Sequence, residues 1–411
     1  MAQYAAVRSP AVRHAAQPGY NHYTAEGRAM FVTPLFRLMA EKQASDLFFT
    51  AGAPIQIKIN GIVTALNDQS LDPEQVKTIC YELMTDNQVK EFETRHEMNF
   101  ARAEADVGNF RVNIFQQRNS VAMVVRFVKP EVPSFESLGL PPILRQVIME
   151  KLGLILVVGS TGSGKSTTMA SMIDYRNTVR TGHILTIEDP IEFIFRHKKS
   201  IVNQREVRVD TYTYDNALIS AMRQAPDLLM IGEIRDRPTL QSALLFAQTG
   251  HLCMSTLHAN NSYNALNRII NFFPREAREA LLADLSIALR CIISQRLVRT
   301  VDGNRTPAVE ILLNTKHIQE LIKDGEISQI KDAIDQSLSP GSQTFEQALY
   351  YLYSSGKITL DEALTYSDSP TNLHWLINNA KGPIKPPAEE QLSAKSADDL
   401  SAIKLNLDAL G

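Results

Sequence analysis

The sequence predicts an α/β protein in which a mostly parallel sheet follows a smaller α+β domain. Short apolar runs recur with helix-length intervals between them, at residues 154–158, 184–187, 228–231 and 252–256. Strands separated by helices in this way form parallel sheets. Prolines cluster between residues 130 and 142, where they mark a linker. The length of 411 residues is sufficient for more than one domain.

The first part of the chain is predicted to form the smaller domain, at residues 30–130. Residues 1–29 show neither helical nor strand periodicity, so we expect a disordered extension there. From Phe31 the spacing of the leucines predicts a short amphipathic helix. Isoleucines then alternate with polar residues as far as Asn60-Gly61, which is a hairpin signal. Two further strands are expected at residues 110–116 and 121–128.

The remaining boundaries follow from composition and periodicity. Residues 131–143 are predicted to be the linker, and residues 144–380 the main domain. Beyond about Asp284 the pattern predicts helices as far as Asn379. The segment KGPIKPPAEEQ, which begins at Lys381, is typical of a linker, so we expect a flexible tail at residues 381–411.

Composition excludes several classes of protein. The formal net charge of −3 at pH 7 provides no basic field for nucleic-acid binding. The three cysteines include no CxxC pair, which argues against a disulfide framework or a zinc site and suits a reducing cytosol. The chain has no long uncharged apolar stretch and no apolar signal core. We therefore expect a cytoplasmic protein that reaches a membrane only through partners.

A glycine-rich turn, GSTGSGKS, follows the first apolar run. Gly162 and Gly164 let backbone N–H groups surround phosphate oxygens, and a helix beginning near Lys165 adds its positive N-terminal end. Lys165 would reach the β- and γ-phosphates, and the Ser166 hydroxyl would bind Mg²⁺. The alternative is a loop that binds nothing. We expect a nucleotide such as ATP to contact Gly159, Ser160, Thr161, Gly162, Ser163, Gly164, Lys165, Ser166 and Thr167.

Two later strands are followed by carboxylates. Glu188 ends the second apolar run, with Glu192 just beyond it. A carboxylate at this edge of the sheet could orient the water that attacks the γ-phosphate, or it could merely cap the next helix. Glu233 follows the run at residues 228–231, as in a Walker-B strand, which supplies a carboxylate to Mg²⁺ directly or through water.

Two histidines flank the last apolar run. His251 precedes it in Thr-Gly-His, and His258 follows it in Thr-Leu-His. A hydroxyl and an imidazole at the end of a strand could sense the γ-phosphate. The alternative is that these are structural histidines.

The order and wording of four segments resemble the secretion/pilus ATPases, which are hexameric motors of type II secretion and type IV pili. The segments are GSTGSGKS, ILTIEDPIE, RQAPDLLMIGEIRD and TGHLCMSTLH. The resemblance extends from Phe31 to Asn379, and ASDLFFTAGAPIQIKING is similar to the small domain of the retraction branch. It implies a RecA-like P-loop NTPase domain, a smaller N-terminal α+β domain of PAS-like type and a helical C-terminal part.

The resemblance also implies roles for individual residues. Glu188 would be the general base or would position the attacking water, and Glu233 would join Ser166 in the Mg²⁺ shell. His258 and His251 would form the histidine box. In such hexamers arginines reach the nucleotide from the small domain; Arg111 and Arg126 are favoured here over Arg118.

The function implied is that of a homo-hexameric, ATP-hydrolysing motor for pilus retraction and twitching motility. It would work in the cytoplasm, at the inner-membrane base of the pilus machine, on a membrane platform protein. The sequence is more similar to the accessory retraction ATPases, and residues Lys316–Leu321 depart from the family's retraction signature. Whether the chain would drive retraction alone or only beside a PilT-like ATPase therefore stays open. The alternatives are a regulatory ring partner of that ATPase with little hydrolysis of its own, and a nucleic-acid-dependent motor, which the absent basic stripe disfavours.

Overall fold

A computed structural model describes residues 31–379 apart from positions 60, 106, 129–131 and 338. The extension predicted at residues 1–29, the hairpin residue Asn60 and the tail predicted at residues 381–411 lie outside the described residues. The chain divides into two compact units, Met1–Pro130 and Glu131–Gly411.

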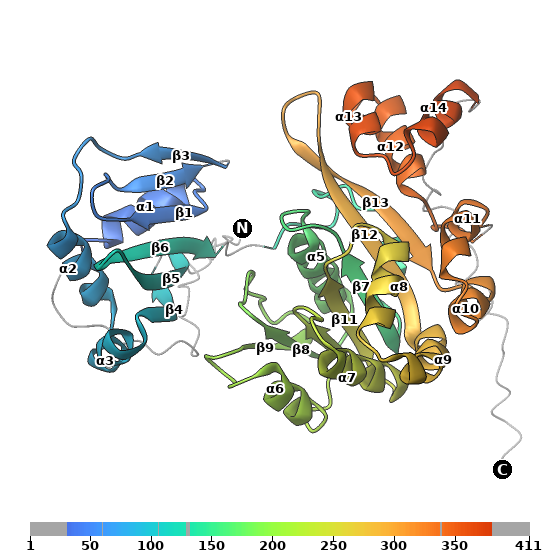
Figure 1. Ribbon diagram of the computed structural model, residues 1–411, viewed down its shortest axis with the longest axis horizontal. Coiled ribbons are helices and arrows are strands. Elements are labelled where there is room, and N and C mark those ends of the chain that lie inside the picture. Colours follow the sequence, from blue (N-terminus) through green and yellow to red (C-terminus); the bar gives the residue numbers. More distant parts are fainter. Residues whose placement is uncertain (1–30, 60, 106, 129–131, 338, 380–411) are drawn as a thin grey trace, which may run out of the picture. The chain divides into compact units, whose positions relative to one another are not determined.

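The first unit is built on a six-stranded antiparallel sheet with the strand order β3-β2-β1-β6-β5-β4 (Figure 1). Its strands are β1 (Asp46–Phe49), β2 (Gln56–Ile59), β3 (Ile62–Ala65), β4 (Glu97–Glu104), β5 (Gly108–Gln117) and β6 (Ser120–Val128). Its helices are α1 (Thr33–Glu41), α2 (Pro73–Leu83) and α3 (Asp86–Arg95). The helices share one buried core with the sheet.

Local signals in the sequence account for these elements. Asp72 and Thr85 each open a capping box, at the starts of α2 and α3. In β5 the residues from Phe110 to Ile114 alternate between buried and half-buried, as expected for a sheet with one face on a core. The structure confirms the predicted helix after Phe31 and the predicted strands at residues 110–116 and 121–128.

The second unit contains a seven-stranded sheet with the order β13-β12-β7-β11-β10-β8-β9. All neighbouring strands run parallel except β13, which is antiparallel to β12. The strands are β7 (Gly153–Val158), β8 (Gly182–Glu188), β9 (Ser200–Glu206), β10 (Leu228–Ile231), β11 (Leu252–Leu257), β12 (Leu289–Arg299) and β13 (Arg305–Leu313). The four apolar runs predicted to be strands are confirmed as β7, β8, β10 and β11.

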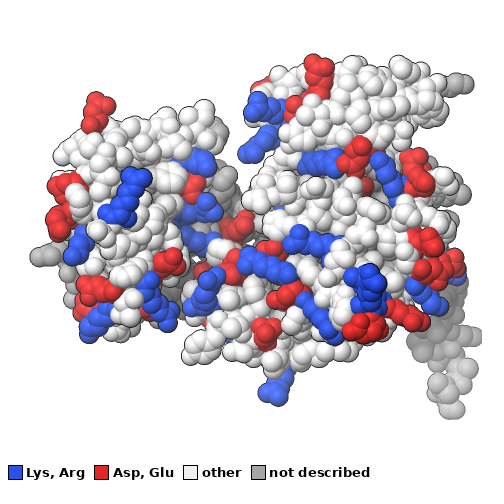
Figure 2. Space-filling model, viewed as in Figure 1, with Lys and Arg blue, Asp and Glu red and all other residues white. Residues whose placement is uncertain are grey.

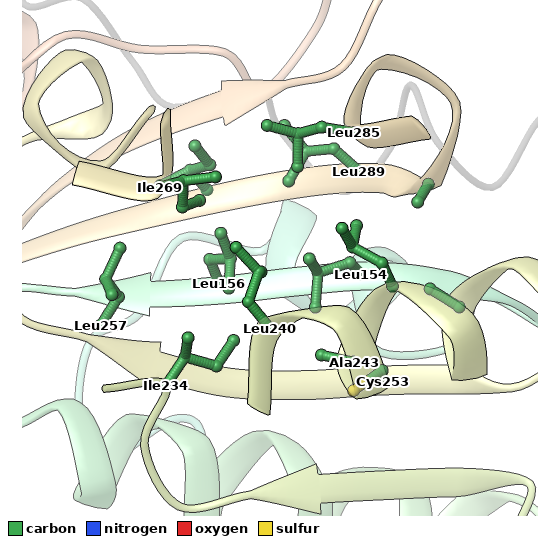
Figure 3. Packing of buried hydrophobic residues seen from close by; sticks show 14 of the residues in the cluster. Leu154, Leu156, Ile234, Leu240, Ala243, Cys253, Leu257, Ile269, Leu285 and Leu289 are labelled. Carbon is green, nitrogen blue, oxygen red and sulfur yellow. The ribbon is translucent and has the colours of Figure 1, made fainter. Parts of the chain in front are cut away.

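Helices pack on both faces of this sheet. They include α4 (Ile143–Val147), α5 (Lys165–Val179), α6 (Tyr214–Ala221), α7 (Arg237–Gln248), α8 (Ser262–Asn271) and α9 (Arg278–Ala288). Leu154 and Ile155 are neighbours in β7 but belong to different hydrophobic clusters, because successive strand residues point to opposite faces. Figure 3 shows the first of these clusters, where Leu240 and Ala243 of α7 lie among the strand residues.

Part of the segment predicted to be the linker at residues 131–143 packs in the second unit. Phe135 and Leu140 are buried in the cluster that also holds Ile155. No helix within the described residues is both long and apolar enough to cross a membrane.

The prediction of helices throughout residues 284–379 is wrong for residues 289–313. A hairpin of β12 and β13 occupies this segment, and β12 adds a parallel strand beside β7. β12 contains the β-branched pair Ile292-Ile293, which suits a strand. A continuous apolar run in a buried strand cannot be distinguished from a buried helix by periodicity alone.

The C-terminal part is helical from Lys316, as predicted. The helices after the hairpin are α10 (Lys316–Lys323), α11 (Ile330–Asp335), α12 (Phe345–Ser354), α13 (Leu360–Thr365) and α14 (Pro370–Asn379), and two 3₁₀ turns lie at Arg275–Ala277 and Ile327–Gln329. The last three helices form a cluster of their own with Val298 and Ala308 of the hairpin.

Candidate functional site

The carboxyl ends of four parallel strands carry most of the predicted site residues. β7 leads into the glycine-rich turn, β8 ends at Glu188, and Glu233 and His258 follow β10 and β11. These strands are neighbours in the sheet, in the order β7-β11-β10-β8. Ligands of open α/β sheets bind at this edge, so the fold brings these groups together.

The glycine-rich turn leaves a cradle whose inner surface is backbone. Gly162 has a φ of 78°, and a Cβ at this position would meet nothing within 4 Å. Gly159 is needed for space, since a Cβ there would lie 2.4 Å from Ser163 Oγ. That hydroxyl is buried and has no hydrogen-bond partner among the described residues. A buried hydroxyl without a partner is costly, and an anion in the cradle would supply an acceptor.

The other members of the predicted phosphate-binding set line the same turn. Ser160 and Thr161 are exposed, Gly164 begins α5 with a φ of 87°, and Ser166 and Thr167 are half-buried in the first turn of that helix. The 15-residue helix α5 directs its free N–H groups and its positive end toward the turn.

Lys165 is buried at the base of the cradle. Its Nζ donates hydrogen bonds to the carbonyl oxygens of Gly159 and Ser160, at 2.9 and 2.8 Å. Burial lowers the pKa of the ammonium, while the charges of Glu233 and Glu192 act to raise it. The lysine therefore faces the carboxylates that follow β8 and β10.

Gln295 of β12 holds the turn from behind, and the sequence analysis missed this residue. Its amide nitrogen donates to the Ser163 carbonyl at 2.7 Å, and its amide oxygen accepts from the Thr168 hydroxyl at 2.6 Å. The side chain is only 2% exposed. Gln295 stands between Ser294 and Arg296 in the sequence, so no local pattern marks it as a buried amide.

Replacing Gln295 by alanine is expected to loosen the cradle. The Thr168 hydroxyl and the Ser163 carbonyl would lose their partner in a buried place, which costs about 1–3 kcal/mol of unfolding free energy. Thermal unfolding and binding of a fluorescent ATP analogue would both be measured. Gln248→Ala is the matched control, because Gln248 bonds Asp284 at the exposed surface. An unchanged midpoint of unfolding together with unchanged nucleotide affinity would contradict this assignment.

Glu188 is a buried carboxylate with two side-chain donors on one oxygen. Thr186 Oγ1 and Gln204 Nε2 donate to its Oε1 at 2.7 and 3.2 Å. Burial raises the pKa of this carboxyl to about 7, and both hydrogen bonds act in the opposite direction. A carboxylate with a pKa near neutrality is suited to act as a general base.

Both carboxylate oxygens of Glu233 lie close to a side-chain nitrogen. Arg235 Nε donates to Oε2 at 2.8 Å, and His258 Nε2 lies 3.3 Å from Oε1. Among the described residues, no three His, Cys, Asp or Glu side chains are grouped as ligands of a metal ion. The donor set of the Ser166 hydroxyl and one carboxylate still suits Mg²⁺, which takes few protein ligands and completes its shell with phosphates and water.

The structure separates the two predicted histidines. His251 directly precedes β11, and its carbonyl accepts from the N–H of Gly153, the first residue of β7. His258 follows the other end of β11. A six-residue strand spans roughly 17 Å, so His251 lies away from the cradle of its own chain. Its ring contacts Thr249 and Phe246 instead.

The predicted arginines lie in the first unit. Arg111 and Arg126 face each other across β5 and β6, and Arg126 Nε donates to the buried carboxylate of Asp46 at 2.8 Å. Arg118 stands apart at the turn of the same hairpin, with a left-handed φ of 44°. The two favoured arginines thus lie opposite each other on neighbouring strands, and Arg118 lies in the turn that joins these strands.

Comparison with known proteins shows which family the chain resembles. The family model of type II/IV secretion system proteins matches residues 28–325. In Pseudomonas aeruginosa, the type IV pilus ATPase PilU is 48% identical over 344 residues, which cover 84% of this chain and 90% of that protein. The type IV pilus retractation ATPase PilT of the same organism is 40% identical over 343 residues, covering 84% of this chain and all of that one.

A solved structure has the same fold. The crystal structure of the pilus retraction motor PilT with bound ADP superimposes with a TM-score of 0.77 at 42% identity, and the match covers 83% of this chain and 99% of that one. The predicted α/β class is therefore confirmed, with an antiparallel N-terminal sheet, a mixed and mostly parallel second sheet and a helical C-terminal part.

Proposed function

Since the chain belongs to the type II/IV secretion system protein family, we propose that it is an ATP-hydrolysing motor of a type IV pilus. It acts in pilus retraction and twitching motility as a PilU-like accessory ATPase. The observation that carries this proposal is the grouping of a phosphate cradle, buried Lys165 and two carboxylates at one sheet edge, in a chain 48% identical to PilU.

The site residues divide the work of hydrolysis. Lys165 and the N–H groups of the cradle bind the β- and γ-phosphates. Ser166 and Glu233 would hold Mg²⁺, which neutralises phosphate charge when bound. Glu188 accepts the proton of the attacking water, and His258, which pairs with Glu233, reports whether the γ-phosphate is present. His251 is given no part at the cradle of its own chain.

We also propose a finer assignment of the two units and of the assembly. The second unit is RecA-like and the first is PAS-like, and six chains form a ring in the cytoplasm, at the inner-membrane base of the pilus machine. Arg111 and Arg126 would complete the nucleotide site of a neighbouring copy, since the cradle itself has a single lysine and the transferring phosphoryl group needs further cations. The other partners are a PilT-like ATPase and a membrane platform protein.

Direct action on nucleic acid has less support. On the face shown in Figure 2, acidic and basic groups are interspersed and form no continuous basic surface. Nucleic-acid motors present a basic stripe along their substrate.

Mixing two inactive variants tests the proposed motor and its shared site. Lys165→Ala removes the cradle lysine, and Arg111→Ala removes a cation supplied to the neighbour. Each variant alone is expected to hydrolyse little ATP. In mixed rings, some interfaces combine an intact cradle with an intact arginine, so the mixture is expected to regain activity.

The control is Arg118→Ala, in the turn of the same hairpin, which should hydrolyse ATP like the wild type. A mixture that stays inactive would contradict the sharing of sites between copies. A wild-type chain that hydrolyses no ATP without a PilT-like protein would instead favour the regulatory ring partner over the motor.

A further inference from the structure

Tyr214 lies beside the candidate catalytic carboxylates and has no role in the site described so far. It is the first residue of α6, whose start is capped by Thr213. Its half-buried ring packs against the hydrophobic cluster that holds Leu240 and Ala243. Glu188, Asp189 and Glu233 are all close enough for their charges to act on its hydroxyl. The sequence analysis did not single this residue out.

Gly232 leaves room for the phenol hydroxyl of Tyr214. A Cβ on Gly232 would lie 2.9 Å from Tyr214 Oη, 3.3 Å from the Ile187 carbonyl and 3.4 Å from Glu188 Cα. Gly232 does not have a left-handed φ, so space rather than backbone conformation requires the glycine. The hydroxyl lies against the place of the missing side chain, near the ends of β8 and β10.

The hydroxyl is available at this place. No hydrogen bond joins it to another group in the described part of the chain, whereas Glu188 receives both of its side-chain donors on Oε1. Burial raises the pKa of the phenol, the three nearby carboxylates raise it further, and Arg235 acts to lower it. The phenol therefore keeps its proton at working pH and can donate it to a hydrogen bond.

We propose that the Tyr214 hydroxyl positions the water molecule that Glu188 deprotonates during ATP hydrolysis. This inference rests on the proposed function, because it assumes that Glu188 is the base. It makes Tyr214 a positioning residue whose hydroxyl and the Glu188 carboxylate hold one water from two sides. A water held by two groups reaches the γ-phosphate in a defined direction, and such positioning contributes to the rate of phosphoryl transfer together with electrostatic stabilisation.

The step balances without any change in Tyr214. The water oxygen forms a bond to the γ-phosphorus as the bond from phosphorus to the β,γ-bridging oxygen breaks. ADP leaves with that electron pair, and a water proton passes to Glu188. Tyr214 keeps its own proton throughout and contributes only orientation.

Tyr214→Phe removes the hydroxyl and keeps the ring that packs on the core. The expected result is a fall in kcat of about tenfold, the effect of one hydrogen bond, with unchanged KM, nucleotide affinity and midpoint of thermal unfolding. The rise of kcat with pH should keep its midpoint, because Glu188 is intact. Tyr212→Phe is the matched control, since Tyr212 is 86% exposed, and its kcat should not change.

Gly232→Ala gives an independent test, because it adds a methyl group beside the Tyr214 hydroxyl. The added methyl displaces the hydroxyl, so kcat should fall in the wild-type background. In the Tyr214→Phe background the methyl no longer meets a hydroxyl, and only its contacts with the Ile187 carbonyl and Glu188 Cα remain. The further fall in kcat should therefore be smaller than in the wild-type background; such coupling marks two residues that act through one contact. Full additivity of the two substitutions would overturn the proposal.

The outcomes separate this inference from the proposed function. If the wild type hydrolyses ATP and Tyr214→Phe does so at the same rate, Tyr214 has no positioning role while the motor assignment stands. If Tyr214→Phe loses nucleotide affinity and thermal stability along with kcat, its role is structural and the inference is wrong. If the wild type hydrolyses no ATP, the proposed function fails and this inference fails with it.

Discussion

Lys165→Ala is expected to lower the rate of ATP hydrolysis by at least about 100-fold, the usual effect of losing one donor to a developing phosphoryl charge. Lys165 is the only lysine of the cradle, and its ammonium sits between the turn carbonyls and the carboxylates that follow β8 and β10. Its loss also removes the side chain that reaches the β- and γ-phosphates, so the affinity for ATP should fall as well. Steady-state phosphate release measures the rate of hydrolysis, and binding of a fluorescent ATP analogue measures the affinity.

Two controls show whether that loss is local. Lys198→Ala removes a lysine that pairs with Asp174 outside the cradle, and this variant should keep its activity. Ser160 is exposed but Gly159 is buried, so the loss of Lys165 leaves one buried carbonyl without this donor and should lower the midpoint of thermal unfolding slightly without unfolding the chain. Wild-type turnover in Lys165→Ala would place the nucleotide elsewhere.

The strands and the cradle could be predicted from the sequence because each has a local signature. The four apolar runs are short and end in polar turns, so they could be identified as strands of a parallel sheet. The cradle combines glycines, a lysine and a hydroxyl at fixed spacing. Glu188 and Glu233 could be found because Glu188 ends β8 and Glu233 stands two positions beyond β10, and parallel strands place their carboxyl ends at one edge.

The other features depend on contacts between distant segments. The hairpin of β12 and β13 was predicted to be helical, since a buried apolar run has no distinct period. Gln295 lies 132 positions from the Ser163 carbonyl that it bonds, so no spacing rule could connect them. Tyr214 matters only because Gly232 leaves room for its hydroxyl, which is a fact of packing. His251 and His258 are close in sequence, yet a whole strand separates them in the fold.

Glu188→Gln is expected to remove nearly all hydrolysis while ATP still binds. The amide keeps the shape of the carboxyl and an oxygen that can accept from Thr186 and Gln204, but it cannot take a proton from water. The loss of a general base typically costs about 10²–10⁴-fold in rate. Phosphate release would be measured beside analogue binding, which should match the wild type. Glu279→Gln is the control, because Glu279 is an exposed acid in the first turn of α9, outside the site.

The pH dependence of activity follows from the raised pKa of Glu188. Since burial raises this pKa to about 7, the carboxylate becomes available as a base only near neutrality. The wild-type kcat/KM, which reports the pKa values of the free enzyme, should therefore rise through a midpoint close to pH 7, far above the ordinary glutamate value of 4.5. A midpoint near 4.5 would show that the pKa of Glu188 is not raised in the active enzyme.

The same pKa makes an opposite prediction for stability. The folded chain holds the Glu188 proton more tightly than the unfolded chain does, so unfolding releases it between about pH 4.5 and pH 7. The stabilisation that comes from the protonated form is present below this window and is lost as pH rises through the folded pKa. Glu188→Gln does not titrate and escapes this loss. Its midpoint of thermal unfolding should thus exceed that of the wild type at pH 8 by more than at pH 5. A difference that stays constant with pH would mean that the folded protein does not raise the pKa of Glu188, and the case for this residue as a base poised near neutrality would fall.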